Sequence, residues 1–133
     1  ARREDIRQRL EAYPDHVLIG TWNGAVVGYV MGPVIDRAYI EDAMFADTGC
    51  HRPEGPYQAI FSLAVLPEFQ HRGFGGQLLR AMEALARREG RRAVTLTCRA
   101  FKVGYYASFG YQDRGIAGSA HGGVRWHNMV LEL

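Results

Sequence analysis

The chain has 133 residues, of which 47% are hydrophobic and 23% are charged. This length suits one domain with a sizeable core, and the composition is ordinary for a soluble globular protein. The 16 Lys and Arg residues nearly balance the 14 Asp and Glu residues, leaving a formal net charge of +2. Such a balance argues against a nucleic-acid-binding protein. We therefore expect residues 1–133 to form a single domain with no nucleic-acid partner.

The two cysteines, Cys50 and Cys98, form no metal-binding pattern. They are typical of reduced thiols in a cytosolic chain. No segment approaches the length of a membrane span, and no signal peptide is visible. The sequence thus predicts a cytoplasmic protein with no metal and no membrane partner, while homodimerisation stays open.

The first third of the chain predicts a helix followed by a β-hairpin. Apolar residues recur at helical spacing over residues 3–13, and Pro14-Asp15 ends that pattern. Residues 16–22 and 25–31 are strand candidates. Asn23-Gly24 between them is a strong two-residue hairpin signal.

Residues 34–50 are harder to assign, because the spacing of Tyr39, Ile40, Ala43 and Met44 merely allows a short helix. Acidic residues of this segment lie beside aromatic ones. That arrangement suits either a solvated helix face or a site for a cationic, aromatic amine. Residues 51–56 predict a loop by their prolines and glycine.

The middle of the chain predicts a strand, a long helix and a second strand. Residues 57–65 are nearly all apolar, as expected for one central strand covered on both faces. Residues 74–88 follow with a helical pattern, and Gly90 marks the end of that helix. Residues 92–98 form the next strand candidate, so the two strands should be parallel and joined by a right-handed crossover. The apolar stripe of the helix consists of Leu78, Leu79, Met82, Leu85 and Ala86.

The last part of the chain predicts a short helix over residues 102–109, ended by Gly110. Residues 111–115 and 124–133 then form two antiparallel strand candidates. The predicted fold class is α/β of the α+β type, with a mixed, mostly antiparallel sheet. A central parallel strand pair in that sheet is flanked by helices.

The turn between the central strand and the long helix reads Gln70-His71-Arg72-Gly73-Phe74-Gly75-Gly76. Glycines let the backbone approach a ligand closely, and the first turn of a helix offers unpaired N–H groups and a positive dipole end. This combination predicts a phosphate or pyrophosphate site. The turn lacks the Gly-Lys-Ser/Thr of a P-loop and the third glycine of a dinucleotide fingerprint.

The pattern Gln-x-x-Gly-x-Gly resembles motif A of the GNAT superfamily of N-acetyltransferases, where it binds the pyrophosphate of acetyl-CoA. A second segment, from Tyr105 to Tyr111, is similar to the family's Phe/Tyr-Tyr-x-x-x-Gly-Phe/Tyr segment. The order of the predicted elements also matches the family. The resemblance implies a single GNAT domain, in which we expect the usual first strand and helix to be missing.

Within the superfamily, the chain most resembles the arylalkylamine (serotonin) N-acetyltransferase group. The matching features are the His51-Arg52-Pro53 loop, the strand end Leu63-Ala64-Val65, and the residues Phe69, Cys98 and Tyr106. That group carries two histidines on the central strand that help take the proton from the amine. This chain has Ala59 and Phe61 there, and neither can accept a proton. Serotonin specificity is therefore not implied.

The resemblance implies direct transfer of an acetyl group from acetyl-CoA, a cosubstrate, to a primary amine on a small molecule or a peptide. Tyr106 is the candidate catalytic acid, since its phenol can donate a proton to the CoA sulfur. The alternative is an acyl-CoA-binding module with little or no turnover. The residues implied in cofactor binding, several of them through the backbone, are Leu63, Ala64, Val65, Gln70, His71, Arg72, Gly73, Phe74, Gly75, Gly76 and Tyr106.

The general base is unassigned. His51, Glu41 and Asp42 are candidates that could act through a water chain, whereas Ser62 is a poor base. We interpret Tyr105 as a core residue and Cys98 as a small buried residue. The histidines interpreted as structural or solvated are His16, His121 and His127.

Overall fold

The computed structural model describes residues 3–41, 44, 48–117 and 125–133. The helices of more than one turn are α1 (Arg3–Ala12), α3 (Phe74–Arg88) and α4 (Val103–Ala107). The strands are β1 (Val17–Trp22), β2 (Ala25–Met31), β3 (Val34–Ile35), β4 (Tyr57–Ile60), β5 (Ser62–Val65), β6 (Ala93–Arg99), β7 (Gln112–Ile116) and β8 (Trp126–Glu132). Short 3₁₀ turns occur at Pro14–His16, Thr48–Cys50, Pro67–Phe69 and Ala100–Lys102.

The strands form two sheets that share the middle of the molecule. One sheet has the order β1-β2-β5, and the other has the order β3-β4-β6-β8-β7. Every pairing is antiparallel except that of β4 with β6. The predicted fold class is therefore confirmed, including its parallel pair and its antiparallel closing strands.

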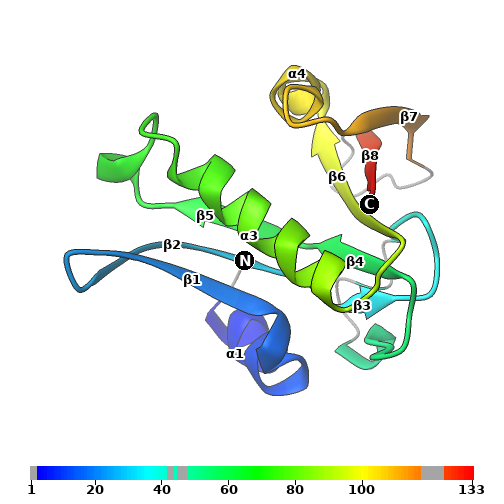
Figure 1. Ribbon diagram of the computed structural model, residues 1–133, viewed down its shortest axis with the longest axis horizontal. Helices are drawn as coiled ribbons and strands as arrows, with labels where there is room; N and C mark the ends of the chain where they lie inside the picture. Colours follow the sequence, from blue (N-terminus) through cyan, green and yellow to red (C-terminus); the bar gives the residue numbers. More distant parts are fainter. Residues whose placement is uncertain (1–2, 42–43, 45–47, 118–124) are drawn as a thin grey trace.

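The prediction of one continuous strand over residues 57–65 is wrong. The strand breaks at Phe61 into β4 and β5. β4 pairs with β6, whereas β5 pairs with β2 and has no partner on the β6 side within the described chain. Figure 1 shows β5 and β6 diverging from the centre of the molecule, β5 toward the left and β6 toward the top. An apolar run indicates that a strand is buried, but it does not specify which neighbours complete it.

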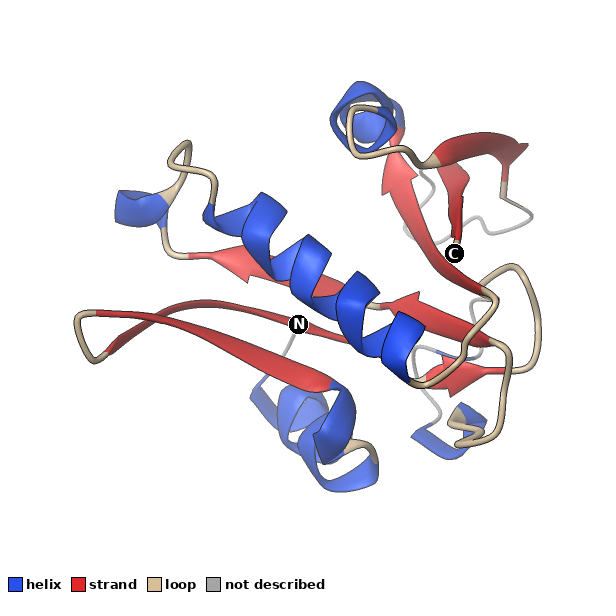
Figure 2. Cartoon of the chain, in the orientation of Figure 1, coloured by secondary structure: helices blue, strands red, loops and turns tan. Residues whose placement is uncertain are grey.

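Helix α3 crosses the front of both sheets and α1 lies behind β1, as Figure 2 shows. The core beneath α3 contains Leu78, Leu79, Met82 and Ala86 from the helix, packed against strand residues such as Val94 and Leu96. The predicted stripe is thus confirmed, with Leu85 only partly buried at its edge. One buried residue of the helix was not expected, because Glu83 is fully buried.

Several local predictions are confirmed at the level of the backbone. Asn23 and Gly24 both have positive φ, at 51° and 83°, as the hairpin between β1 and β2 requires. Gly90, with φ 75°, follows the end of α3. The short helix expected near Tyr39 falls partly on residues outside the described ranges. No helix in the described ranges is long and apolar enough to cross a membrane.

Candidate functional site

The turn before α3 has the backbone geometry of an anion site. His71 and Gly73 both adopt left-handed conformations, with φ of 64° and 86°. Gly73 caps α3 without a side-chain hydrogen bond, and the first turn of the helix contains no acidic residue. The first intrahelical bond is donated by the N–H of Gln77 to the carbonyl of Gly73 at 3.1 Å. The N–H groups that precede Gln77 are the orphan donors of the helix start, and they form the positive end of the helix dipole, with no acidic residue in the first turn of the helix.

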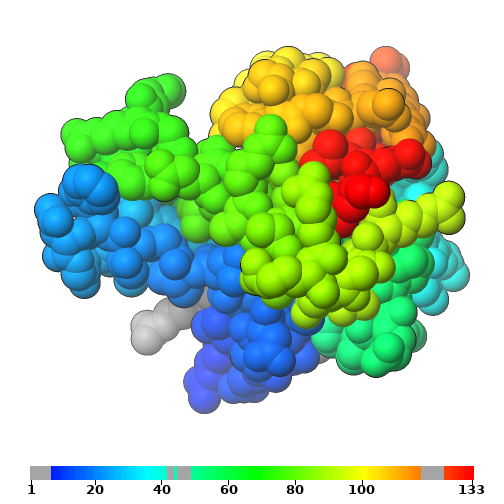
Figure 3. Space-filling view, in the orientation of Figure 1, coloured from blue at the N-terminus to red at the C-terminus, as the bar shows by residue number. Residues whose placement is uncertain are grey.

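A pocket of about 930 Å³ joins this turn to the free edge of β5 and to α4. Leu63, Ala64 and Val65 of β5 form one wall, and Tyr105, Tyr106 and Phe109 form the opposite wall. In the space-filling view the surface is indented between these two segments (Figure 3). An edge strand exposes backbone N–H and C=O groups to whatever enters. The pocket therefore offers hydrogen bonds along β5 and an anion site at its end.

Most of the predicted cofactor-binding residues line this pocket. They are Leu63, Ala64, Val65, Gln70, His71, Gly73, Gly75, Gly76 and Tyr106. Arg72 and Phe74 do not line it. The guanidinium of Arg72 lies 5.5 Å from the ring centroid of Phe69, and Phe74 stacks edge-on against Phe69 and Trp22. The side-chain amide of Gln70 donates to the carbonyl of Val65 at 3.0 Å, which ties the turn to the end of β5.

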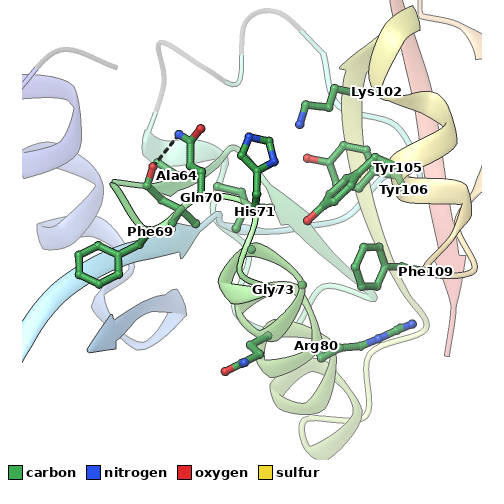
Figure 4. Close-up of a pocket in the computed structure, with 15 residues that line it drawn as sticks. Ala64, Phe69, Gln70, His71, Gly73, Arg80, Lys102, Tyr105, Tyr106 and Phe109 are labelled. Carbon is green, nitrogen blue, oxygen red and sulfur yellow. Dashed lines mark hydrogen bonds between the residues drawn. The ribbon is translucent and has the colours of Figure 1, made fainter. Parts of the chain in front are cut away.

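The two tyrosines of α4 both face the pocket, as Figure 4 shows. Tyr106 also packs against the core, whereas Tyr105 does not belong to the core cluster. The interpretation of Tyr105 as a core residue is therefore wrong. Its hydroxyl lies 3.0 Å from the position that a Cβ on Gly75 would take. Sequence alone does not say which residues of a five-residue helix meet a neighbouring loop.

Burial dominates the acid–base properties at this wall. Burial, with smaller effects of Cys98 and Tyr105, raises the pKa of Tyr106 to about 12. The Tyr106 hydroxyl has no hydrogen-bond partner among the described residues. Burial likewise raises the pKa of the Cys98 thiol to about 11, with a further contribution from Asp113. Tyr106 is thus a protonated, uncommitted donor at neutral pH, in surroundings that disfavour thiolates.

Neither of the described candidate bases, His51 and Glu41, lines the pocket. The Nδ1 atom of His51 accepts the N–H of Val34 at 3.0 Å, beside Tyr13 and His16, and His51 does not line the pocket. Glu41 pairs with Arg37 on the surface. Asp42 and His121 lie outside the described residues.

The remaining histidines have structural partners or belong to the turn. His16 Nε2 lies 2.9 Å from Glu89 Oε1, and His127 Nδ1 lies 3.2 Å from Asp113 Oδ2. His71 carries the one imidazole among the described residues that line the pocket. No group of three His, Cys, Asp or Glu residues in the described ranges could hold a metal ion.

Sequence reasoning missed several lining residues, namely Phe69, Gln77, Arg80, Lys102, Tyr105 and Phe109. Arg80 and Lys102 are the cations of this set. Figure 4 shows Lys102 and Tyr105 reaching toward His71, while Arg80 extends from α3 beneath Phe109. Arginines recur along α3, and their number hides the one that faces the pocket. The signal that singles out Arg80 is a glutamate three residues later, inside the apolar stripe.

Comparison with known proteins agrees with this geometry. The model of the acetyltransferase (GNAT) family matches residues 1–111. A search of curated protein sequences finds no match.

Solved structures share the fold at low sequence identity. The GphF GNAT-like decarboxylase in complex with isobutyryl-CoA has a TM-score of 0.84 at 19% identity, covering 99% of this chain and 85% of that chain. The loading GNATL domain of CurA from Lyngbya majuscula has a TM-score of 0.81 at 14% identity, covering 99% and 83%. A GNAT family acetyltransferase from Elizabethkingia anophelis with acetyl-CoA bound has a TM-score of 0.71 at 17% identity, covering 99% and 84%.

Proposed function

This chain belongs to the acetyltransferase (GNAT) family, and we propose that it transfers an acetyl group from acetyl-CoA to a primary amine by direct attack. The observation that carries the proposal is one continuous pocket that is lined by the turn before α3, the free edge of β5 and Tyr106. The edge of β5 suits the amide-containing arm of CoA. The helix start suits its pyrophosphate.

In the proposed reaction, the amine nitrogen forms a bond to the thioester carbon and the carbon–sulfur bond breaks. The electron pair of that bond leaves on sulfur, and Tyr106 donates its proton to the resulting thiolate. The amine gives up one proton to water or to a base, so the products are an amide and free CoA. Tyr106 recovers its proton from solvent. The backbone N–H groups at the edge of β5 are suited to hold the thioester oxygen as negative charge develops on it.

The surroundings of Tyr106 support this role. An exposed thiol has a pKa of about 8.5, below that of a phenol. In water, a thiolate therefore leaves without help more readily than a phenol gives it a proton. Near Tyr106, however, burial raises the pKa of the Cys98 thiol to about 11. A CoA thiolate formed beside Tyr106 should meet the same low polarity. The pKa of the Tyr106 phenol is about 12. The difference between the pKa of the CoA thiol and that of the phenol then narrows, and proton donation by Tyr106 becomes useful.

Proton removal from the amine is proposed to proceed without an imidazole on the central strand, where Ala59 and Phe61 stand. The measurement is kcat/KM against pH for the best amine, compared with Glu41→Gln, Asp42→Asn and His51→Gln. We expect activity to rise toward the pKa of the free amine in all four proteins. A plateau below pH 7 that disappears in one variant would instead identify that residue as the base.

The class of amine is proposed more broadly than the arylalkylamine group that the sequence resembles. A small-molecule or peptide amine is the expected acceptor, and a panel that includes aromatic amines, polyamines, amino sugars and peptide N-termini tests it. The readout is free thiol released from acetyl-CoA. Release that depends on the amine supports the proposal.

Two other outcomes have distinct meanings. Tight CoA binding without turnover on any amine would favour the alternative, an acyl-CoA-binding module, for which the loss of the central-strand histidines is the motivation. Because one structural neighbour is a GNAT-like decarboxylase, reactions without amine form a separate arm. Consumption of acyl-CoA in that arm would point to acyl-CoA chemistry other than amine acetylation.

A further inference from the structure

A buried carboxylate lies within the apolar stripe of α3 and is fully paired. Glu83 is 0% exposed. One of its oxygens accepts a hydrogen bond from the buried Tyr111 hydroxyl at 3.0 Å. The other accepts from Arg80 Nη1 at 2.6 Å. A buried carboxylate is tolerated only when its oxygens are paired, so its geometry is tightly held.

Arg80 is the outward-facing member of this network. Its side chain is 50% exposed and lines the pocket, and its guanidinium lies 5.0 Å from the ring centroid of Phe109. Glu83 on one side and the aromatic ring on the other restrain a group that is normally mobile. The remaining N–H groups of a guanidinium form a planar fork that matches phosphate oxygens. Arg80 is thus a pre-positioned anion-binding group in the groove between α3 and α4.

The position of Arg80 along α3 suits the nucleotide end of CoA. The lining of the pocket includes the edge of β5 and also, in the groove between α3 and α4, Arg80 and Phe109. The proposed thioester arm takes the edge of β5, which leaves the groove for the nucleotide end. Arg80 lies five residues beyond Gly75, about 7.5 Å along the helix axis. In CoA, one ribose separates the pyrophosphate from a second phosphate.

We propose that Arg80, held by Glu83, binds the 3′-phosphate of CoA, so that the protein discriminates CoA from its 3′-dephospho form. This inference rests on the proposed function. Arg80 is a specificity-determining residue that contacts the ligand. Glu83 is a positioning residue that acts through Arg80, with Tyr111 as its second support.

Lys102 is the competing cation of the pocket. Its ammonium lies 4.8 Å from the ring centroid of Tyr105, on the side of the pocket that faces His71 (Figure 4). There it faces the turn rather than the groove. Lys102 should therefore act on the pyrophosphate, which CoA and dephospho-CoA share, and should not distinguish the two.

The experiment is calorimetric titration of the full chain with CoA and with dephospho-CoA at fixed salt. We expect the wild type to bind CoA about tenfold more tightly, a difference of about 1.4 kcal/mol. Arg80→Gln should bind both ligands with the lower affinity of dephospho-CoA, whereas Lys102→Gln should weaken both equally and keep their ratio. The matched control is Arg87→Gln, an exposed arginine of the same helix outside the pocket, which should leave both affinities unchanged.

Glu83→Gln tests the positioning role by the same ratio. It keeps the shape and an acceptor for Tyr111 but removes the charge that holds Arg80, so the preference for CoA should shrink without reaching unity. Tyr111→Phe provides a second variant if Glu83→Gln fails to fold. A preference for CoA that grows in either variant would overturn the positioning role, because it would mean that Glu83 merely weakens Arg80 by neutralising it.

The outcomes separate this inference from the function beneath it. Equal wild-type affinities for CoA and dephospho-CoA, or an unchanged ratio in Arg80→Gln, would overturn the inference and leave the acyl-CoA assignment intact. Loss of the ratio in Lys102→Gln alone would assign the phosphate to Lys102 instead. Binding of neither ligand would overturn the acyl-CoA assignment, and this inference with it.

Discussion

Strands β4 and β5 are separated by one residue and have similar apolar sequences, yet β4 lies inside one sheet and β5 lies at the edge of the other. β4 lies between β3 and β6 and is largely buried. The amide of its Gln58 donates to the carbonyls of Gly32 and Ala59, both at 2.8 Å, and of Pro33 at 3.2 Å. β5 is an edge strand, half-buried along its whole length, with its free side toward the pocket.

This difference shows where the fold leaves main-chain N–H and C=O groups without hydrogen bonds. At the closed end, around β4, strands and buried side chains satisfy the main-chain groups, so the chain is fixed there. At the open end, around β5, one row of main-chain groups is left for a ligand. Changes at the closed end should therefore affect folding, and changes at the open end should affect binding and rate.

The largest expected effect comes from breaking the closed end with Gly32→Ala. The added Cβ would lie 2.0 Å from the carbonyl oxygen of Ala59, so β4 would have to move. Strain of this kind costs about 1–3 kcal/mol and occasionally more, and thermal unfolding measures it. The matched control is Gly104→Ala in α4, where a Cβ meets nothing within 4 Å and stability should be kept or slightly raised. Wild-type stability in Gly32→Ala would show that the closed end is not rigid.

Next in size is the loss of ligand binding at the open end in Gly75→Val. A Cβ on Gly75 would already lie 3.0 Å from the hydroxyl of Tyr105, and the larger side chain would fill the anion site. At a CoA concentration of about 100 times Kd, the wild type should gain about 2.7 kcal/mol of stability. The variant should fold and gain none. An unchanged thermal shift with CoA would remove the turn from the binding site.

A smaller effect, on rate alone, is expected from Tyr106→Phe. The ring keeps its packing while the proton donor is lost, so kcat should fall on the order of 100-fold with little change in CoA affinity. Tyr105→Phe serves as the control, because it removes a hydroxyl from the same pocket and should retain most of the rate. Equal rates in wild type and Tyr106→Phe would exclude Tyr106 as the acid. A large loss of rate in Tyr105→Phe would indicate that Tyr105 is the proton donor instead.

The smallest expected effect is a pH dependence of stability at the closed end. Burial lowers the pKa of His51, with further lowering by the charges of His16, Arg91 and Arg52, while Glu89 opposes it. The unfolded chain therefore binds this proton more readily than the folded chain, so stability should fall as the pH drops through about 6.5. Protonation also turns the acceptor of the Val34 N–H into a donor.

His51→Asn is the matched variant for this test, because its Oδ1 can accept the same hydrogen bond but does not titrate. Melting temperatures between pH 7.5 and pH 5.5 should fall less in the variant than in the wild type. That range stays above the region in which carboxylates titrate. Identical slopes in the two proteins would assign the pH dependence to other groups.

Much of the open end could be predicted from the sequence because it depends on local chemistry. The glycines of the turn, the helix that starts at Phe74 and the Asn23-Gly24 hairpin each depend on a few neighbouring residues. Their conformations follow from local φ/ψ preferences and helix-end hydrogen bonding. The cofactor-binding residues are implied by the family resemblance instead, and nine of the eleven line one pocket, with Arg72 and Phe74 outside it.

The tertiary structure alone decided how distant segments meet. The apolar run of residues 57–65 could not indicate that β4 pairs with β6 while β5 pairs with β2, because strand pairing joins residues far apart in the chain. Likewise, the buried position of Glu83 in the apolar stripe is explained by its hydrogen bond from Tyr111, which is 28 positions away in the sequence. Local preferences act over one or two turns of chain, whereas the free edge of β5 and the fixed position of Arg80 arise only when those segments pack together.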